Sequence, residues 1–176
     1  MVDFSLLYRN DRRYDDALET IRQSETIGRE IANSKFEMQH ESQVRPSIFL
    51  WRSQVELGEI YREKGDAAAA EPVFERSLEA VGDLKMPPGN PKVAELLDNY
   101  ATLLRDEEKY SRSEALYIRS LDVWGKTGRP ENLETARTLT NYAALLRKLD
   151  RPAEAEKLEA RSSAIQAKID PVTQVN

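Results

Sequence analysis

Apolar residues recur along most of the chain at the three- and four-residue spacing of amphipathic helices. One such run consists of Leu97, Tyr100, Ala101 and Leu104. The segments that carry these runs are rich in the good helix formers Ala, Leu, Glu, Arg and Lys. The alternation typical of strands, with many Val, Ile and Thr residues, is absent from the sequence. The pattern therefore predicts an all-helical protein.

Clusters of Gly and Pro separate the helical segments. They lie at 65–66, 86–91, 125–130 and 150–152. Such clusters are typical of turns and loops, so they mark the expected boundaries between helices.

The same order of residue types returns three times along the chain. Gly58, Ala101 and Ala143 are equivalent, which gives a period of 43 and then 42 residues. In each copy a second small residue follows twelve positions later, in the next helix. Small residues at both positions let two antiparallel helices approach closely. Because one helical hairpin cannot bury both of its faces, the copies are expected to stack.

A degenerate fourth copy opens the chain. Residues 5–9 match the end of a first helix, into which Met1 falls, and residues 14–24 match a second helix. Its spacing to the next copy is 53 residues, and the extra residues fall within 31–45, which includes His40. We interpret this stretch as an extended second helix followed by a loop.

The copies resemble the tetratricopeptide repeat. Five residues of the first complete copy stand at the offsets of that family: Leu57, Gly58, Tyr61, Ala70 and Phe74. The standard repeat has about 34 residues, and the excess here lies in the links 86–94 and 128–136. With these long links the copies look like repeats of the kinesin light chain type, over nearly the whole chain.

The resemblance implies an all-α solenoid, a right-handed superhelix of stacked antiparallel hairpins. We expect a single domain over 1–176. Its expected parts are a partial first repeat at 1–45, repeats at 46–91, 92–134 and 135–170, and a tail at 171–176.

In this family the first helices line a concave groove that takes up a peptide or partner protein. The resemblance places the positions just off the packed stripe in that groove: Arg52, Val55, Glu56, Glu59 and Glu63; Glu95, Asp98, Asn99, Thr102 and Arg105; Arg137, Thr140, Asn141, Ala144 and Lys148. The predicted partner-binding residues are Asn99, Asn141, Arg105, Arg147, Arg62, Thr102, Arg137 and Lys148.

Asn99 and Asn141 are equivalent and lie mid-helix, where Asn is a poor helix former. Two interpretations stay open. In the first, each amide forms hydrogen bonds with the backbone of a bound extended peptide, because it has both a donor and an acceptor. Alternatively, each amide bonds to a neighbouring helix or loop.

One Arg recurs at the same offset in every copy: Arg9, Arg62, Arg105 and Arg147. The series forms either a line of guanidinium groups for a partner's carboxylates or a set of ion pairs with nearby acids, and surface charge on helices favours the ion pairs. The family's clamp for a C-terminal carboxylate is not carried over, because Val55 and Glu56 occupy positions where cationic or amide side chains are needed.

The two Trp residues are expected to be buried. Trp124 lies at the end of a second helix, among apolar residues. Trp51 begins a first helix and either packs on the long second helix of the opening copy or anchors a partner. Packing is favoured for Trp51.

The composition removes several functional classes. The chain has 176 residues with no Cys, one His and a net charge of −5. Disulfides, thiolate sites and His-based metal sites are therefore excluded, and we expect no cofactor. The net charge of −5 also argues against a nucleic-acid binder, because such a protein normally has a basic surface. The apolar run 48–51 is far too short for a transmembrane segment, and Met1 begins no signal peptide.

No nucleotide-binding or catalytic motif occurs, and paired carboxylates lie at turns or first turns of helices. The sequence therefore predicts a non-catalytic adaptor or scaffold that binds a peptide or partner protein in the concave groove. The alternative is a structural subunit that associates, with itself or with another chain, through the ends of the stack. The sequence leaves two compartments open, the cytoplasm and, if an export signal was removed, the bacterial periplasm.

Overall fold

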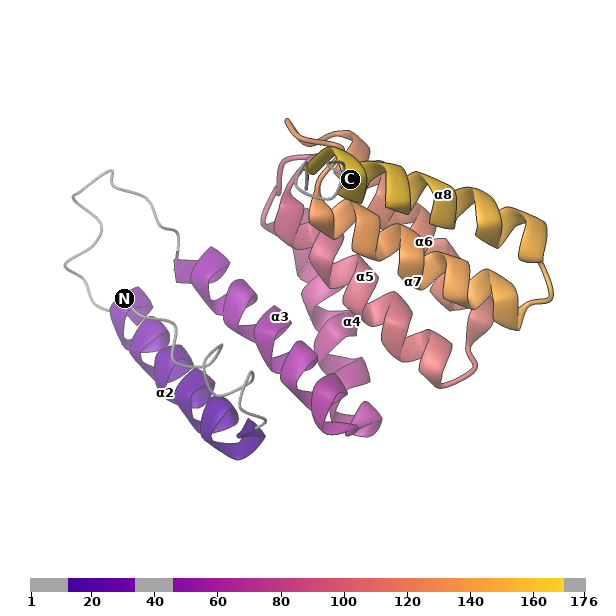
Figure 1. Cartoon of the computed structure of the whole chain (residues 1–176). Coiled ribbons are helices and arrows are strands. Elements are labelled where there is room, and N and C mark those ends of the chain that lie inside the picture. The colour runs from indigo at the N-terminus through magenta and orange to yellow at the C-terminus, as the bar shows by residue number, and fades with distance from the viewer. Residues whose placement is uncertain (1–12, 34–45, 170–176) are drawn as a thin grey trace. The chain divides into compact units, whose positions relative to one another are not determined.

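The computed structural model describes residues 13–33 and 46–169 (Figure 1). These residues form α2 (Tyr14–Asn33), α3 (Pro46–Lys64), α4 (Ala67–Asp83), α5 (Pro91–Asp106), α6 (Tyr110–Gly125), α7 (Leu133–Lys148) and α8 (Pro152–Ile169). The described ranges contain helices and no strand, so the all-helical prediction is confirmed. The predicted loop that contains His40, the helix end at 5–9 with Arg9, and the tail 171–176 lie outside the described residues.

The helices group into two compact units, which meet in sequence between Lys85 and Met86. In unit 1, α3 and α4 form a hairpin and α2 packs on α3. In unit 2, α5–α6 and α7–α8 form two hairpins, and α7 contacts both helices of the hairpin before it. Each hairpin corresponds to one complete predicted repeat. The expectation of a single domain over 1–176 stays a prediction.

Side-chain caps fix where several helices begin. Asp66 accepts a hydrogen bond from the N–H of Ala69 at the start of α4. The side chains of Asn90 and Asn132 cap α5 and α7 in the same way. These caps satisfy N–H groups that have no partner inside the helix. Three of the four helices that follow a predicted Gly and Pro cluster, α4, α5 and α7, therefore begin at a capping side chain.

The turns inside the three hairpins are alike. Gly65, Glu108 and Asp150 occupy equivalent positions with left-handed backbones, at φ 82°, 62° and 56°. In each turn the next residue donates its N–H to a carbonyl five positions back, over 2.8 to 2.9 Å. This bond satisfies a carbonyl left free at the helix end.

The small residues of each repeat lie where the two helices of a hairpin meet. A Cβ atom added to Gly58 would lie 2.6 Å from Cε1 of Phe74. In α6, the hydroxyl of Ser113 donates to the carbonyl of Ala101 over 2.7 Å. Ala143 is 1 % exposed. The predicted close approach is confirmed.

Trp51 is buried inside unit 1, and its indole N–H donates to the carbonyl of Ser77 in α4 over 2.7 Å. Trp51 is therefore packed inside the protein, as favoured, but its hydrogen bond goes to α4 and not to α2, the second helix of the opening copy on which it was predicted to pack. Trp124 is also buried, as expected.

Unit 2 shows what Trp51 replaces. Ser120 and Ser162 of the second helices donate to the carbonyls of Ala94 and Ala136, both over 2.8 Å. Trp51 stands at the position equivalent to these two Ala residues. The larger side chain reverses the bond, because the donor is now on the first helix and the acceptor on the second.

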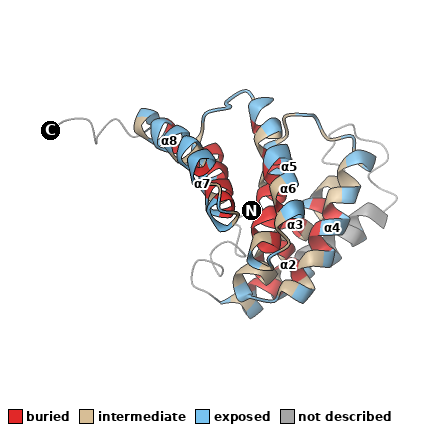
Figure 2. Cartoon of the chain, turned by 90° about the vertical axis from the view of Figure 1, so that its right-hand side faces the viewer, coloured by how far each residue is buried: buried red, intermediate tan, exposed pale blue. Residues whose placement is uncertain are grey.

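The core of unit 2 is densest along α5, where eleven of sixteen residues are buried. Buried residues are red in Figure 2. Tyr117 of α6 and Tyr142 of α7 stack with ring centroids 5.7 Å apart. Ile165 of α8 packs with Ala136 and Leu139 of α7. The tyrosine stack therefore holds the two hairpins of unit 2 against each other, and the Ile165 contact holds α8 on α7.

Candidate functional site

Seven of the eight predicted partner-binding residues lie on the first helices α5 and α7, which contact each other. Arg62 lies on α3 in unit 1. We define the α5–α7 face by these seven residues and the Asp98 carboxylate, which Asn141 and Arg137 contact: Asp98, Asn99, Thr102, Arg105, Arg137, Asn141, Arg147 and Lys148.

Asp98 is the buried centre of this face. It is 1 % exposed. Asn141 donates from Nδ2 to both carboxylate oxygens, over 3.2 and 3.4 Å. Nε of Arg137 lies 3.6 Å from Oδ2. A buried carboxylate needs such partners, because it has lost its hydration. We call this three-residue arrangement the Asp98 clasp.

The clasp decides what Asn141 does in the free protein. Its amide bonds to a neighbouring helix, which is one of the two interpretations that the sequence left open for the Asn pair. Asn99 and Thr102 are each 8 % exposed, and the Thr102 hydroxyl shares a 3.0 Å hydrogen bond with Tyr117. Neither residue therefore offers much surface to a partner.

The Arg series is engaged in ion pairs wherever the structure describes it. Arg147 makes two hydrogen bonds to Glu159 of α8, over 2.8 and 2.7 Å. These bonds raise the pKa of Arg147 and lower the pKa of Glu159. Arg105 pairs with Asp106 over 2.8 Å, and Arg62 lies 3.7 Å from Glu63.

Arg105 also donates to the backbone carbonyl of Asn141 over 3.5 Å, and so ties α5 to α7. The ion pairs of Arg62, Arg105 and Arg147 agree with the favoured interpretation of the Arg series. Partner binding by the same residues stays a prediction.

The accessible part of the face is a row along α7. Arg137, Asn141, Ala144 and Lys148 follow the spacing i, i+4, i+7 and i+11, which lies along one side of a helix. The Arg137 side chain is 47 % exposed. Lys148 is exposed and has no ion pair or hydrogen bond with the residues that the structure describes. It is therefore an available cation.

A second polar cluster joins α6, α7 and the start of α8. One oxygen of Glu114 accepts from the Tyr142 hydroxyl and from Arg151, both over 2.7 Å. Arg151 also pairs with Glu154. Burial and the bond to Glu114 raise the pKa of Tyr142 to about 12. The sequence analysis missed this cluster, because the repeat pattern contains no signal that pairs position 114 with 142 or 151.

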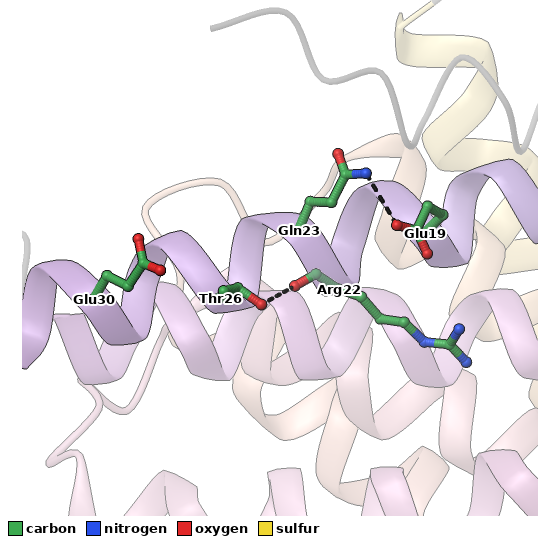
Figure 3. Close-up of a pocket in the computed structure, with 5 residues that line it drawn as sticks. All are labelled: Glu19, Arg22, Gln23, Thr26 and Glu30. Carbon is green, nitrogen blue, oxygen red and sulfur yellow. Dashed lines mark hydrogen bonds between the residues drawn. The ribbon is translucent and has the colours of Figure 1, made fainter.

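A shallow hollow lies along α2 in unit 1 (Figure 3). The described residues that line it are polar and belong to this helix: Glu19, Arg22, Gln23, Thr26 and Glu30. Gln23 donates to Glu19, and Thr26 donates to the carbonyl of Arg22. Among the residues that the structure describes, α2 alone lines the hollow.

Two further findings concern metals and membranes. In 13–33 and 46–169, no three His, Asp or Glu side chains are grouped so that they could hold a metal ion. None of the described helices combines the length and the apolar character that crossing a membrane requires.

Two family models, both described as tetratricopeptide repeat, match residues 52–80 and 92–168. Together the two ranges cover more than half of the chain. No curated protein sequence matches the chain significantly.

Solved structures with the same architecture exist at low sequence identity. BtubC (BKLC) from P. vanneervenii matches with a TM-score of 0.72 and 18 % identity, over 95 % of this chain and 62 % of that one. The chain thus spans less than two thirds of BtubC, and the likeness shows the fold alone.

Two structures of nearly identical TPR-like repeats, from a Podosopora anserina protein described as a kinesin light chain, match with a TM-score of 0.40 each. The first is 15 % identical and covers 96 % of this chain and 94 % of that one. The second is 16 % identical and covers 99 % and 95 %.

The repeat geometry agrees with the family matches. α5 begins at Pro91 and α7 at Leu133, which is the 42-residue spacing of the long, kinesin-light-chain-like repeat. Each hairpin carries small residues at its helix contact and a left-handed residue at its turn. With two matching family models and this geometry, the chain belongs to the tetratricopeptide repeat family.

Proposed function

We propose that the protein is an interaction scaffold whose α5–α7 face binds an extended peptide segment of a partner protein. Tetratricopeptide repeats are in general protein–protein interaction scaffolds, and their fold is typically a non-catalytic interaction module.

The observation that carries the proposal is the row on α7. Arg137, Asn141 and Lys148 are polar, accessible and aligned on one side of a helix, with the small Ala144 between them. The Lys148 side chain has no partner among the described residues, so a ligand carboxylate can form an ion pair with it without breaking an existing one. The small side chain at 144 leaves room for a peptide backbone to approach.

The rigidity of unit 2 supports the same proposal. The Asp98 clasp fixes α7 on α5, and the Tyr117–Tyr142 stack fixes α7 on α6. A surface that is already ordered loses little conformational entropy when it binds, so the ordering cost falls mainly on the peptide.

The test is a selection of peptides from a phage-displayed random library on the wild-type protein. The selected peptide is then titrated against two charge-reversal variants, Lys148→Glu and Arg119→Glu. Both residues are exposed cations of unit 2 without a partner among the described residues, but Arg119 lies on α6. We expect Lys148→Glu to weaken binding at least about tenfold, the size of one charge-assisted hydrogen bond, and Arg119→Glu to leave it within about twofold.

Equal loss in both variants, or in neither, contradicts the proposed face. Helicity by circular dichroism has to be unchanged in both variants. Because both changes are made at solvent-exposed positions, neither is expected to disturb folding.

The polar surface of α8 argues against the alternative, association through α8 at the end of the stack, although Ile169 at its last position is exposed. The positions of α8 equivalent to Tyr117, Leu121 and Trp124 of α6 are Glu159, Ser163 and Gln166. Ser163 and Gln166 are exposed, and α8 is mostly tan and pale blue in Figure 2. Stacking on this surface would bury polar groups in place of the Tyr, Leu and Trp contacts that α6 provides.

A further inference from the structure

We propose that Asp98 is a positioning residue that sets the hydrogen-bond polarity of the α5–α7 face. The clasp holds the Asn141 side chain with its oxygen, Oδ1, toward the bound peptide. At this point the face therefore accepts a hydrogen bond from a backbone N–H of the peptide. This inference rests on the proposed function, because it names what that face recognises.

The polarity follows from the chemistry of the two groups. An ionised carboxylate accepts hydrogen bonds and donates none, whereas an amide has a donating and an accepting end. Since the Asn141 amide lies within 3.2 and 3.4 Å of the two Asp98 oxygens, its Nδ2 has to face the carboxylate. The opposite orientation would place two acceptors against each other. Oδ1 is therefore the end that faces away from Asp98.

The clasp is hard to open. Asp98 is 1 % exposed, so its charge has little water to replace lost partners. Arg137 lies against the same carboxylate, and Arg105 holds the backbone carbonyl of Asn141 from the neighbouring helix. The amide is thus fixed at both its side chain and its backbone.

Oδ1 of Asn141 is the end left for a ligand. It accepts no hydrogen bond from any described residue, and Asn141 is partly exposed. The peptide N–H is the donor that every extended segment carries, except at proline. A peptide carbonyl at the same place would face Oδ1 without a hydrogen. The face is therefore expected to select for an N–H at this point and against proline.

The first arm of the test asks whether Asp98 orients the amide. Asp98→Asn is nearly isosteric but lets the two amides pair in either direction. Asp122→Asn is the matched control, since it makes the same change at an exposed acid of α6 that pairs with Lys126 and has no hydrogen bond or ion pair with Asn141. In ¹H–¹⁵N spectra, with the Asn141 side-chain signals assigned from an Asn141→Ala variant, we expect Asp98→Asn to shift and broaden them and Asp122→Asn to leave them unchanged.

The second arm tests which backbone N–H of the peptide donates a hydrogen bond to the oriented Asn141 amide. The probe is the peptide selected on the wild-type protein, resynthesised with single amide-to-ester replacements that remove one N–H each. We expect one ester to weaken binding about three- to tenfold, the size of one ordinary hydrogen bond. That loss should vanish in Asn141→Ala, shrink in Asp98→Asn and persist in Asp122→Asn.

The outcomes separate this inference from the proposed function. A peptide that binds the face but has no ester position sensitive to Asn141 overturns the inference and leaves the proposed function standing. Unchanged Asn141 signals in Asp98→Asn overturn the positioning role. If the library yields no peptide for this face, the proposed function fails, and the reading of a peptide N–H fails with it.

Discussion

At the scale of single residues, the helix contact in unit 1 is tightest between Gly58 and Phe74. The Phe74 ring is fully buried, and its atoms would lie 2.6 to 3.1 Å from a Cβ at position 58. Real Cβ atoms do not approach other atoms so closely. A methyl group here must therefore displace the ring or separate the helices.

We predict that Gly58→Ala destabilises unit 1 by about 1–3 kcal/mol, the usual cost of overpacking a core. Gly82→Ala is the control, because Gly82 also lies in a helix but has no atom within 4 Å of an added Cβ. The control should hold or raise stability, since Ala is the better helix former. Urea unfolding followed by circular dichroism measures both, and equal midpoints would contradict the predicted clash.

The two stacked tyrosines predict how stability depends on pH. Burial raises the pKa of both Tyr117 and Tyr142 from 10.0 to about 12. The fold therefore favours the neutral phenols, so their contribution is complete below pH 10 and is lost as the pH rises through about 12. Urea midpoints should fall between these two pH values. The fall should be smaller in Tyr117→Phe, which removes one titrating group, and an equal fall would contradict the assignment.

The residue scale also shows where sequence reasoning ends. The equivalence of Gly58, Ala101 and Ala143 is visible in the sequence, because each lies at one offset within a repeat. The contact of Asn141 with Asp98 is not visible, since it joins residues 43 positions apart through the stacking of two helices. A residue pattern gives the offsets within a repeat, but the choice of partner across repeats depends on packing.

At the scale of elements, the three hairpins share one turn but differ in how well the sequence suits it. The left-handed conformation is easy for Gly65 and strained for Glu108 and Asp150, because a Cβ atom crowds the following carbonyl. The same hydrogen bond closes all three turns. The fold thus imposes the turn even where the residue does not favour it.

We predict that Glu108→Gly raises the free energy of unfolding by up to about 1 kcal/mol, because glycine removes the strain at φ 62°. Glu108 is exposed and has no partner among the described residues, so little else is lost. The reciprocal change, Gly65→Ala, should cost about 1 kcal/mol although there is space for its Cβ. Thermal unfolding of both variants is the measurement. Destabilisation by Glu108→Gly would show that the turn is not strained.

The helices and their boundaries were the features that could best be predicted from the sequence. Gly and Pro clusters mark the ends of the helices, and α3, α5 and α7 begin within two residues of the predicted repeat starts at 46, 92 and 135. This succeeds because turn chemistry and helical periodicity are local properties. The polarity of individual contacts, such as the reversed bond of Trp51, depends on the neighbouring helix and was not predictable.

At the scale of the whole molecule, the repeats do not contribute equally. In unit 2, α5 has eleven buried residues and α7 has eight. In unit 1, the buried residues of α2 whose exposure is described are Ala17, Leu18 and Ile21. In a repeat protein each element is stabilised by its immediate neighbours, so local stability follows local burial.

Hydrogen exchange should therefore rank the helices by burial. We predict that the most protected amides lie in α5 and those of α2 exchange faster, by at least about tenfold, which corresponds to 1.4 kcal/mol of opening free energy. The physical reason is that opening α5 exposes apolar side chains packed against α6 and α7, whereas the described core contact of α2 with α3 consists of Ala17, Leu18 and Ile21 against Ile60. Exchange measured by mass spectrometry on peptides from the two helices tests this order. Equal protection would mean that the chain opens only as one cooperative body, which contradicts local stability set by burial.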